Sequence, residues 1–355
     1  MSAIKRFFYI SNLNKIRLRT VIYIAFFWTA IDIVIVLLRE NEQMHTKSIW
    51  FREGLIFSVS IIMGYLFVFR LRKMLRHFPL GLNFLAKSVI LLGSALLLTF
   101  IIQFSNSIFI QKLNAAEAYH EIQSYALYRN WLLEKIIYWM IIFFITQLIL
   151  IINEKYSPDV FIDILVGKYI HPKIENRIIM FIDLKDSTPI AEKLGHSLYF
   201  EFIREFIYRI SMAIIEFGGT IYQYVGDEVV CSWKNSEKNT RRCLDAVILS
   251  KKNIQRKGNY FKKKYGIVPE FRVGINVGEV TIGEIGVIKK DLAMSGDTMN
   301  TTARIRGACN ELKHHFVVSK EFVDAAALKG WQTESLGMVD LKGKKYEIEL
   351  FSLKI

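Results

Sequence analysis

Two aspartates in the second half of the chain have positions that suit metal binding. Asp183 ends the apolar run 178–182, and Asp227 lies in the turn of QYVGDEVV, between two strand-like segments. If these strands are neighbours in one sheet, the two carboxylates lie at adjacent strand ends. Such a pair can hold divalent cations whose coordination a triphosphate completes. Isolated aspartates also occur as helix caps, so the interpretation depends on further partners.

A third segment favours phosphoryl chemistry. SGDTMNTTARI opens a predicted helix in which Asn300 and Arg304 are four residues apart and therefore share a face. A guanidinium can neutralise charge that develops on phosphorus, and an amide can orient a ribose oxygen. In isolation the same pair is common on a solvated helix surface. The combination with the two aspartates is what indicates a site.

The segments around these residues predict one α+β domain over residues 176–355. The expected elements are a strand at 178–183, a helix at 189–217, hairpin strands at 220–225 and 228–233, a helix at 237–265, strands within 270–286, a helix at 298–309 and a strand at 315–319. Their order, β-α-β-β-α-β, is that of a ferredoxin-like fold. Residues 153–175 are expected to form a linker with a helix at 157–170.

The first half of the chain is unusually apolar, and 52% of all 355 residues are hydrophobic. Apolar stretches at 21–38, 54–69, 86–104 and 136–152 each approach the length of a membrane-spanning helix. They predict an α-helical membrane domain over residues 1–152, with four transmembrane helices in contact with lipid. Asp32, inside the first stretch, is a possible functional polar group.

Basic residues predict the orientation of the spans. They gather before the first span and between the second and third, at Lys5, Arg6, Lys15, Arg17, Arg19, Arg70, Arg72, Lys73 and Arg76. Because positive residues stay inside, we expect a multi-pass protein of the inner or plasma membrane, with the N-terminus and the α+β domain in the cytoplasm. The first span lacks a small-residue cleavage site, which favours a retained helix over a signal peptide.

Charge and cysteine content exclude other classes. The net charge of +14 could suggest nucleic acid, but much of the excess flanks the apolar stretches, so no nucleic-acid partner is expected. Cys231, Cys243 and Cys309 lack the spacing of metal ligands and are expected to be reduced.

Four motifs, FIDLKDST, YQYVGDEVV, FRVGINVGEV and GDTMNTTARI, together resemble the catalytic domain of class III nucleotidyl cyclases over about residues 155–355. The resemblance implies formation of cyclic AMP or cyclic GMP with two divalent cations, Mg²⁺ or Mn²⁺. It also implies a head-to-tail homodimer with shared sites. By position, Asp183 and Asp227 would bind the metals, Asn300 and Arg304 would act on the ribose and the transition state, and Lys342 would bind phosphate.

The resemblance places Gln223 and Ala293 where family members read the base. ATP-using members typically carry Lys and Asp there, and GTP-using members carry Glu and Cys. A methyl group cannot bond a base edge, whereas the amide of Gln223 can donate and accept. ATP is favoured because the guanine-type pair is absent. The alternatives are a guanylyl or dual-specificity cyclase, and an inactive cyclase-like membrane receptor that only binds nucleotide or dimerises.

Overall fold

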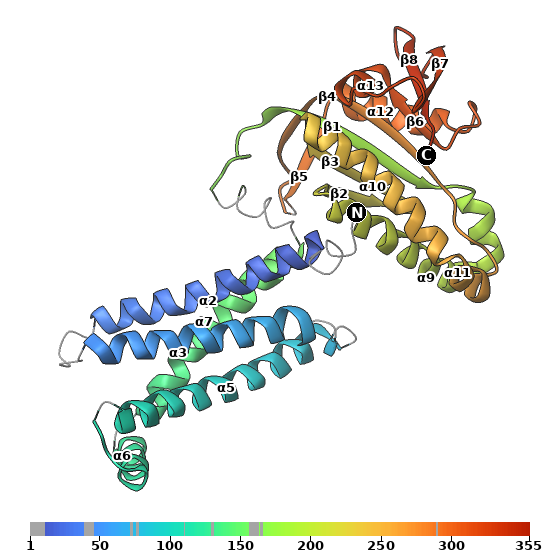
Figure 1. Cartoon of the computed structure of the whole chain (residues 1–355). Coiled ribbons are helices and arrows are strands. Elements are labelled where there is room, and N and C mark those ends of the chain that lie inside the picture. Colours follow the sequence, from blue (N-terminus) through green and yellow to red (C-terminus); the bar gives the residue numbers. More distant parts are fainter. Residues whose placement is uncertain are drawn as a thin grey trace. The chain divides into compact units, whose positions relative to one another are not determined.

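The computed structural model describes residues 11–38, 46–71, 74–75, 78–109, 111–128, 131–155, 163, 166–288 and 290–355. The chain divides into two compact units, a helical one that ends at Tyr156 and an α+β one that begins at Ser157 (Figure 1). The predicted helix at 157–170 lies largely outside the described residues, as do Lys5, Arg6, Arg72, Lys73 and Arg76 of the orientation argument.

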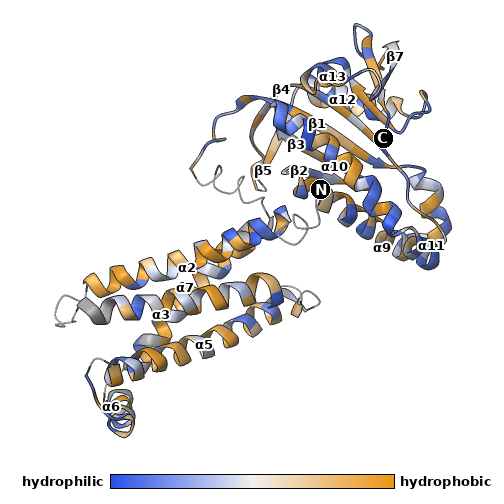
Figure 2. Ribbon diagram, viewed as in Figure 1, coloured by the Kyte–Doolittle hydropathy of each residue, from blue (hydrophilic) through white to orange (hydrophobic). Residues whose placement is uncertain are grey.

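The helical unit is built from long apolar helices, coloured mainly as hydrophobic in Figure 2. Its elements are α2 (Asn12–Leu38), α3 (Thr46–Tyr65), the π-helix η1 (Leu66–Leu71), α5 (Leu80–Phe109), α6 (Ala115–Tyr128) and α7 (Trp131–Lys155). Within the described residues, three stretches are long and apolar enough to cross a membrane: Asn12–Leu37, Trp50–Leu71 and Gly81–Phe109. The first three predicted spans are thus confirmed as such helices. The fourth coincides with a shorter apolar stretch of α7, Ile136–Ile151.

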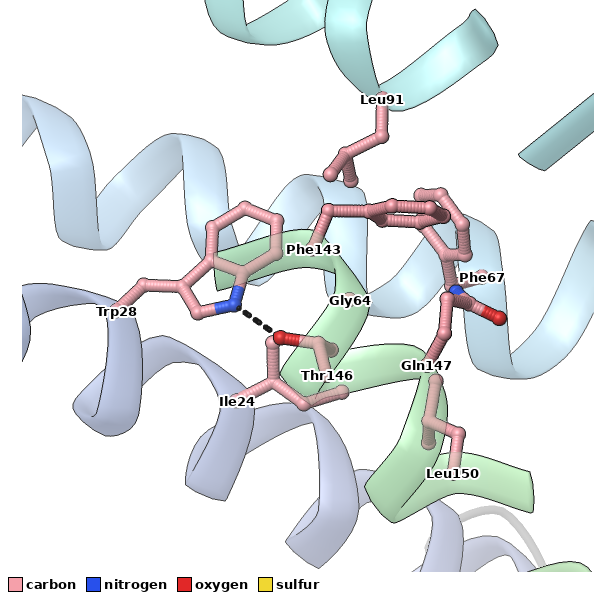
Figure 3. A pocket seen from close by; sticks show the side chains of 9 residues that line it. All are labelled: Ile24, Trp28, Gly64, Phe67, Leu91, Phe143, Thr146, Gln147 and Leu150. Atoms are coloured by element: carbon pink, nitrogen blue, oxygen red, sulfur yellow. Dashed lines mark hydrogen bonds between the residues drawn. The ribbon is translucent and has the colours of Figure 1, made fainter. Parts of the chain in front are cut away.

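Aromatic side chains fill the core between α2 and α7. The rings of Trp28 and Trp139 meet edge to face, with centroids 5.9 Å apart. Figure 3 shows a small pocket in this core, lined by side chains from α2, α3, η1, α5 and α7. Trp28 Nε1 donates a hydrogen bond of 2.9 Å to Thr146 Oγ1 there. A polar contact between helices in apolar surroundings fixes how they pack against each other.

The α+β unit is organised around one mixed sheet. Its strands are β1 (Lys173–Leu184), β2 (Thr220–Val225), β3 (Glu228–Lys234), β4 (Phe271–Ile285), β5 (Asp291–Ser295), β6 (Phe316–Ser319), β7 (Thr333–Val339) and β8 (Ile348–Leu353). The sheet order is β2-β3-β1-β4-β6-β8-β7, with β5 paired to β4. Only the pairing of β4 with β6 is parallel among the described strands.

Helices cover both faces of this sheet. Successive side chains of β1 point to opposite faces and are apolar on both, so each face needs a layer of helices to bury it. The helices are α9 (Ser187–Glu216), α10 (Glu237–Arg256), α11 (Gly258–Tyr265), α12 (Asp297–Ala308) and α13 (Lys320–Ala325). Ile178, Met180 and Ile182 pack into the core that includes α9 and α10. Ile179 and Phe181 point to the other face, where α12 contributes Met299. Alternation with period two is what a strand buried on both sides requires.

The predicted β-α-β-β-α-β order is present as β1, α9, β2, β3, α10 and β4, and the paired order β2-β3-β1-β4 is that of a ferredoxin-like sheet. The prediction of separate strands within 270–286 was wrong, because β4 is one continuous strand. Its glycines allow a helix to pack close against the strand and do not interrupt it. A Cβ at Gly278 would lie 2.5 Å from Thr298 Oγ1 of α12.

We expect Gly274→Ala to destabilise the α+β unit. A Cβ there would lie 2.5 Å from the Arg306 backbone nitrogen and 2.9 Å from its Cα, so α12 would have to move away from β4. Overpacking of this kind costs about 1–3 kcal/mol. Denaturant unfolding of the full chain in detergent measures the loss.

Gly307→Ala, on the helix α12 that packs against Gly274, is the matched control. No heavy atom lies within 4 Å of a Cβ at Gly307, and alanine favours helix over glycine, so unfolding should be unchanged or slightly harder. Equal unfolding free energies for the two variants would show that a Cβ at position 274 fits between β4 and α12 without strain.

Candidate active site

Three carboxylates meet where β1 ends beside the β2–β3 hairpin. Ile182 pairs with Val229 of β3, so the next residue of β1, Asp183, lies beside Glu228. The two-residue turn 226–227 joins β2 to β3, and Gly226 has the positive φ of 61° that the turn needs. The hairpin thus brings Asp227 to the same strand end as Asp183, as the sequence predicted.

Burial makes this group of acids electrostatically strained. The side chains of Asp183 and Glu228 are 16% and 12% exposed. Burial is the main cause that raises the pKa of Asp183 to about 6; Arg306 and Arg272 act to lower it, and the charges of Asp227 and Glu228 act to raise it. Burial likewise raises the pKa of Glu228. Oδ2 of Asp227 is buried and has no hydrogen-bond partner among the described residues.

Such oxygens fit a hard divalent cation, which would supply the missing positive charge. In the part of the chain that the structure describes, no group of three or more His, Cys, Asp or Glu side chains forms a complete metal site. Asp183 and Asp227 could therefore hold Mg²⁺ or Mn²⁺ only together with oxygens of another kind, such as those of the backbone or of a bound phosphate.

Arg306 is the counter-charge that the sequence analysis missed. Its Nη1 lies 3.4 Å from Asp183 Oδ2, and its Nη2 lies 2.5 Å from Glu228 Oε2. It follows Arg304 by two residues on α12, a spacing that places the two arginines on opposite sides of a helix. The spacing of four residues, which led to Asn300 and Arg304, does not include Arg306. The sequence RIR nevertheless shows a second arginine on the same helix.

Arg304 faces the turn between β7 and β8 instead. A Cβ at Gly343 would lie 3.3 Å from Arg304 Nη2. Lys344 in the same turn donates a hydrogen bond of 2.5 Å to Asp297, the first residue of α12. Lys342 is exposed beside this turn. The structure therefore brings Arg304 close to the loop of Lys342, and it brings Asp183 close to Asp227.

Asn300 is exposed on α12, one turn before the half-buried Arg304. Because side chains four residues apart share a helix face, Asn300 belongs with Arg304 and the Lys342 turn. Sequence-predicted site residues thus form two groups in one chain. Asp183 contacts Arg306 on one side of α12, and the Asn300–Arg304 pair lies on another.

The two predicted base-reading residues lie on strands that touch. Gln223 is exposed on β2, and Ala293 is half-buried on β5 opposite Gly283. Next to them, the backbone N–H of Met294 donates a hydrogen bond of 3.0 Å to the Tyr222 hydroxyl. The Tyr222 side chain of β2 thus reaches the backbone of β5, and each predicted residue is one position along its strand from this contact.

Residues 170–354 match the family described as the adenylate and guanylate cyclase catalytic domain. This match covers more than half of the chain, and the chain belongs to that family. The match includes the mixed sheet described above and the strand ends that carry the acids.

Two of the known relatives are adenylate cyclases by name. The chain is 31% identical over 207 residues to Adenylate cyclase 2 of Rhizobium meliloti (strain 1021), covering 58% of this chain and 57% of that protein. It is 24% identical over 216 residues to Adenylate cyclase of Anabaena cylindrica, covering 57% and 42%. The chain thus spans less than two thirds of the length of these relatives.

A solved bacterial light-regulated adenylyl cyclase has a similar fold, with a TM-score of 0.53 and 17% sequence identity. The similarity covers 61% of this chain and 64% of that one.

Metal binding should depend on pH through Asp183. Without metal, the raised pKa means that the folded state binds the proton more tightly than the unfolded state does. This carboxyl therefore contributes stability below its unfolded pKa of about 4, and the contribution is lost as pH rises through about 6. A cation needs the ionised form, so stabilisation by Mn²⁺ should be large at about pH 8 and small at about pH 5.

Thermal unfolding of the full chain with and without Mn²⁺ at both pH values measures this effect. Asp183→Asn should remove the Mn²⁺ stabilisation, whereas Asp324→Asn, an exposed acid on α13, should keep it. Mn²⁺ stabilisation that is equal at both pH values, or that survives in Asp183→Asn, would rule out Asp183 as the ligand.

Proposed function

We propose that the chain is a membrane-anchored nucleotidyl cyclase that converts ATP to cyclic AMP and pyrophosphate in a homodimer. The observation that carries the proposal is the buried acid group of Asp183 and Asp227, with its unpartnered carboxylate oxygen, inside a domain of the cyclase family. The adenylate cyclase names of these two relatives support ATP as substrate, whereas another relative is named a receptor-type guanylate cyclase. The apolar helices would anchor the enzyme in an inner or plasma membrane, with α7 as a fourth span and the N-terminus and catalytic domain in the cytoplasm.

The reaction is an in-line attack of the ribose 3′ oxygen on the α-phosphorus, with pyrophosphate as the leaving group. Two Mg²⁺ or Mn²⁺ ions, when bound, lower the pKa of the hydroxyl and neutralise phosphate charge. Asp183 and Asp227 would hold these ions. Arg304 neutralises the charge that develops on the transferred phosphoryl group, Asn300 orients the ribose, and Lys342 binds a terminal phosphate.

A shared site explains why Arg304 lies away from the acids of its own chain. In one chain Asp183 and Glu228 contact Arg306, and the guanidinium of Arg304 lies against Gly343. Two copies related by a two-fold axis can place the acids of one opposite the Asn300–Arg304 face of the other. Each dimer would then hold two equivalent sites.

Base recognition is the open part of this proposal. Gln223 can donate to or accept from either purine, and Ala293 can do neither. A pocket without committed polar groups cannot impose the large penalties that unpaired groups cause. A guanylyl or dual-specificity enzyme is therefore the alternative, and an inactive receptor with a cyclase-like domain is the alternative from another class.

Product analysis tests the activity and the base preference. The purified full chain is incubated separately with ATP and with GTP and Mn²⁺, and the products are identified by mass spectrometry. We expect cyclic AMP and pyrophosphate, with a preference over GTP below about a thousandfold, or about 4 kcal/mol. Gln223→Lys with Ala293→Asp should sharpen the preference for ATP.

Asp227→Asn is the control for this experiment and should form no cyclic product while it remains folded. If folded wild-type protein forms no cyclic nucleotide from either substrate, the inactive-receptor alternative is correct. If cyclic GMP dominates, the assignment of ATP is wrong.

Complementation between inactive chains tests the shared site. A chain with Asp183→Asn keeps a good Asn300–Arg304 pair, and a chain with Arg304→Ala keeps good acids. With random pairing, about half of the dimers are mixed and each has one intact site, so about a quarter of wild-type activity should return. Cyclic nucleotide output after co-expression in one membrane measures the recovery.

The matched control is co-expression of Asp183→Asn with Asp227→Asn. Both lesions then affect the acid side, every site is damaged, and no activity should return. If the first pair co-purifies but also stays inactive, each chain carries its own complete site and the shared arrangement is refuted.

A further inference from the structure

Four polar side chains meet inside the apolar helical unit, far in sequence from the candidate active site. Asp32 belongs to α2, Arg52 and Glu53 to α3, and Tyr138 to α7. Asp32 and Glu53 are almost completely buried, at 2% and 6% exposed. Ionisable groups in a membrane-spanning segment are costly, so a function is the first hypothesis for them.

Asp32 has a counter-charge and a hydrogen-bond donor beside it, although its Oδ2 accepts no hydrogen bond among the described residues. Arg52 Nη2 lies 2.9 Å from Asp32 Oδ1 and 2.8 Å from Oδ2. The Tyr138 hydroxyl donates a hydrogen bond of 3.1 Å to Oδ1 of the same carboxylate. The positive charge of Arg52 is therefore matched by Asp32.

Glu53 has no such partner. It lies beside Asp32 and Arg52, yet both of its carboxyl oxygens are buried without a hydrogen-bond partner among the described residues. If it were ionised, two carboxylates would share one guanidinium and leave a net charge of about −1 in apolar surroundings. A buried carboxylate in that situation is far more costly than a neutral carboxyl group.

Among the side chains that the structure describes, the other packed helices offer no further positive charge to Glu53. α5, which also packs against α3, has Lys87 as its one charged residue in the described range, near the opposite end of the bundle. On α7, Glu134 lies one turn before Tyr138, is engaged in a contact of its own and adds negative charge to this end.

The polar group also lies at one level of the bundle. Asp32 is about six residues from the end of α2, and Glu53 and Tyr138 are each about seven residues from the start of their helices, which is about 9–11 Å at 1.5 Å per residue. This is the end of the bundle where α2 stops and where α3 and α7 begin. A small ion from water on that side has a short path to the site.

We propose that Glu53 is a proton-binding site of the helical unit. A proton taken up from water makes the carboxyl neutral, and its O–H donates to the carboxylate of Asp32. The group then holds one negative and one positive charge, with the Asp32–Arg52 ion pair kept. When the proton returns to water, Glu53 repels Asp32 across the contact between α3 and α2, so the packing of these helices responds to proton binding.

Infrared spectroscopy of the full chain in lipid nanodiscs tests the proton directly. Wild-type protein at neutral pH should show the stretch of a protonated carboxyl group that shifts in heavy water. Glu53→Gln should lose this band, and Glu117→Gln, an exposed acid of α6, should keep it. Absence of the band in wild type, or its persistence in Glu53→Gln, would overturn the proposal.

Thermal unfolding in the same nanodiscs provides an independent readout. Glu53→Gln should match wild type at about pH 4, where the carboxyl is neutral in both the folded and the unfolded state, and it should lack the loss of stability that wild type shows as pH rises from there. Asp32→Asn, which strips Arg52 of its partner, should unfold at lower temperature at every pH. If Glu53→Gln is equally damaged at every pH, Glu53 is ionised and paired. If Na⁺ stabilises wild type but not Glu53→Gln at constant pH, the site binds a metal cation. Either result contradicts the proton.

Discussion

The close approach of α12 to β4 is the constraint on which the candidate active site depends. Gly274 and Gly278 leave room for the helix backbone, and Thr298 Oγ1 donates a hydrogen bond of 2.7 Å to the Glu279 carbonyl of the strand. Any side chain at Gly274 would meet the backbone of Arg306. The position of both arginines of α12 is thus set by the absence of two side chains on a neighbouring strand.

Buried carboxylates dominate the polar chemistry of both units, and each unit balances them differently. At the end of β1, Arg306 contacts Asp183 and Glu228, while an oxygen of Asp227 is left without a partner. That deficit suits a divalent cation, because hard oxygen ligands and a double charge match it. In the helical unit, Arg52 is matched by Asp32, and the deficit at Glu53 is small enough for one proton. The size of the uncompensated charge distinguishes the two proposed ligands.

The sequence predicted the arrangement of the acids well, because short-range patterns determine it. A Gly-Asp turn between two β-rich segments defines a hairpin, and the β-α-β-β-α-β order sets which strand lies beside it. Side-chain contacts between residues far apart in the sequence could not be predicted from such patterns. Arg306 was missed because its partners are far away in sequence, and β4 was divided because its glycines resemble breaks unless the helix against them is known. The strands β5, β7 and β8 are short or interrupted by irregular pairing, which weakens their sequence pattern.

The two sides of α12 also explain why one chain is an incomplete catalyst under the proposed function. A helix places residues 304 and 306 about 200° apart, so one rigid element cannot aim both guanidinium groups at the same acids. Arg306 already lies against Asp183 and Glu228, and the turn around Gly343, tied to Asp297 through Lys344, holds Arg304 on the other side. Bringing Arg304 to its own acids would require α12 to rotate against β4, which the close packing at Gly274 opposes. Under the proposed function, a second copy would supply the same arginine without any such rotation, and the packing of one helix would then be the reason for the dimer.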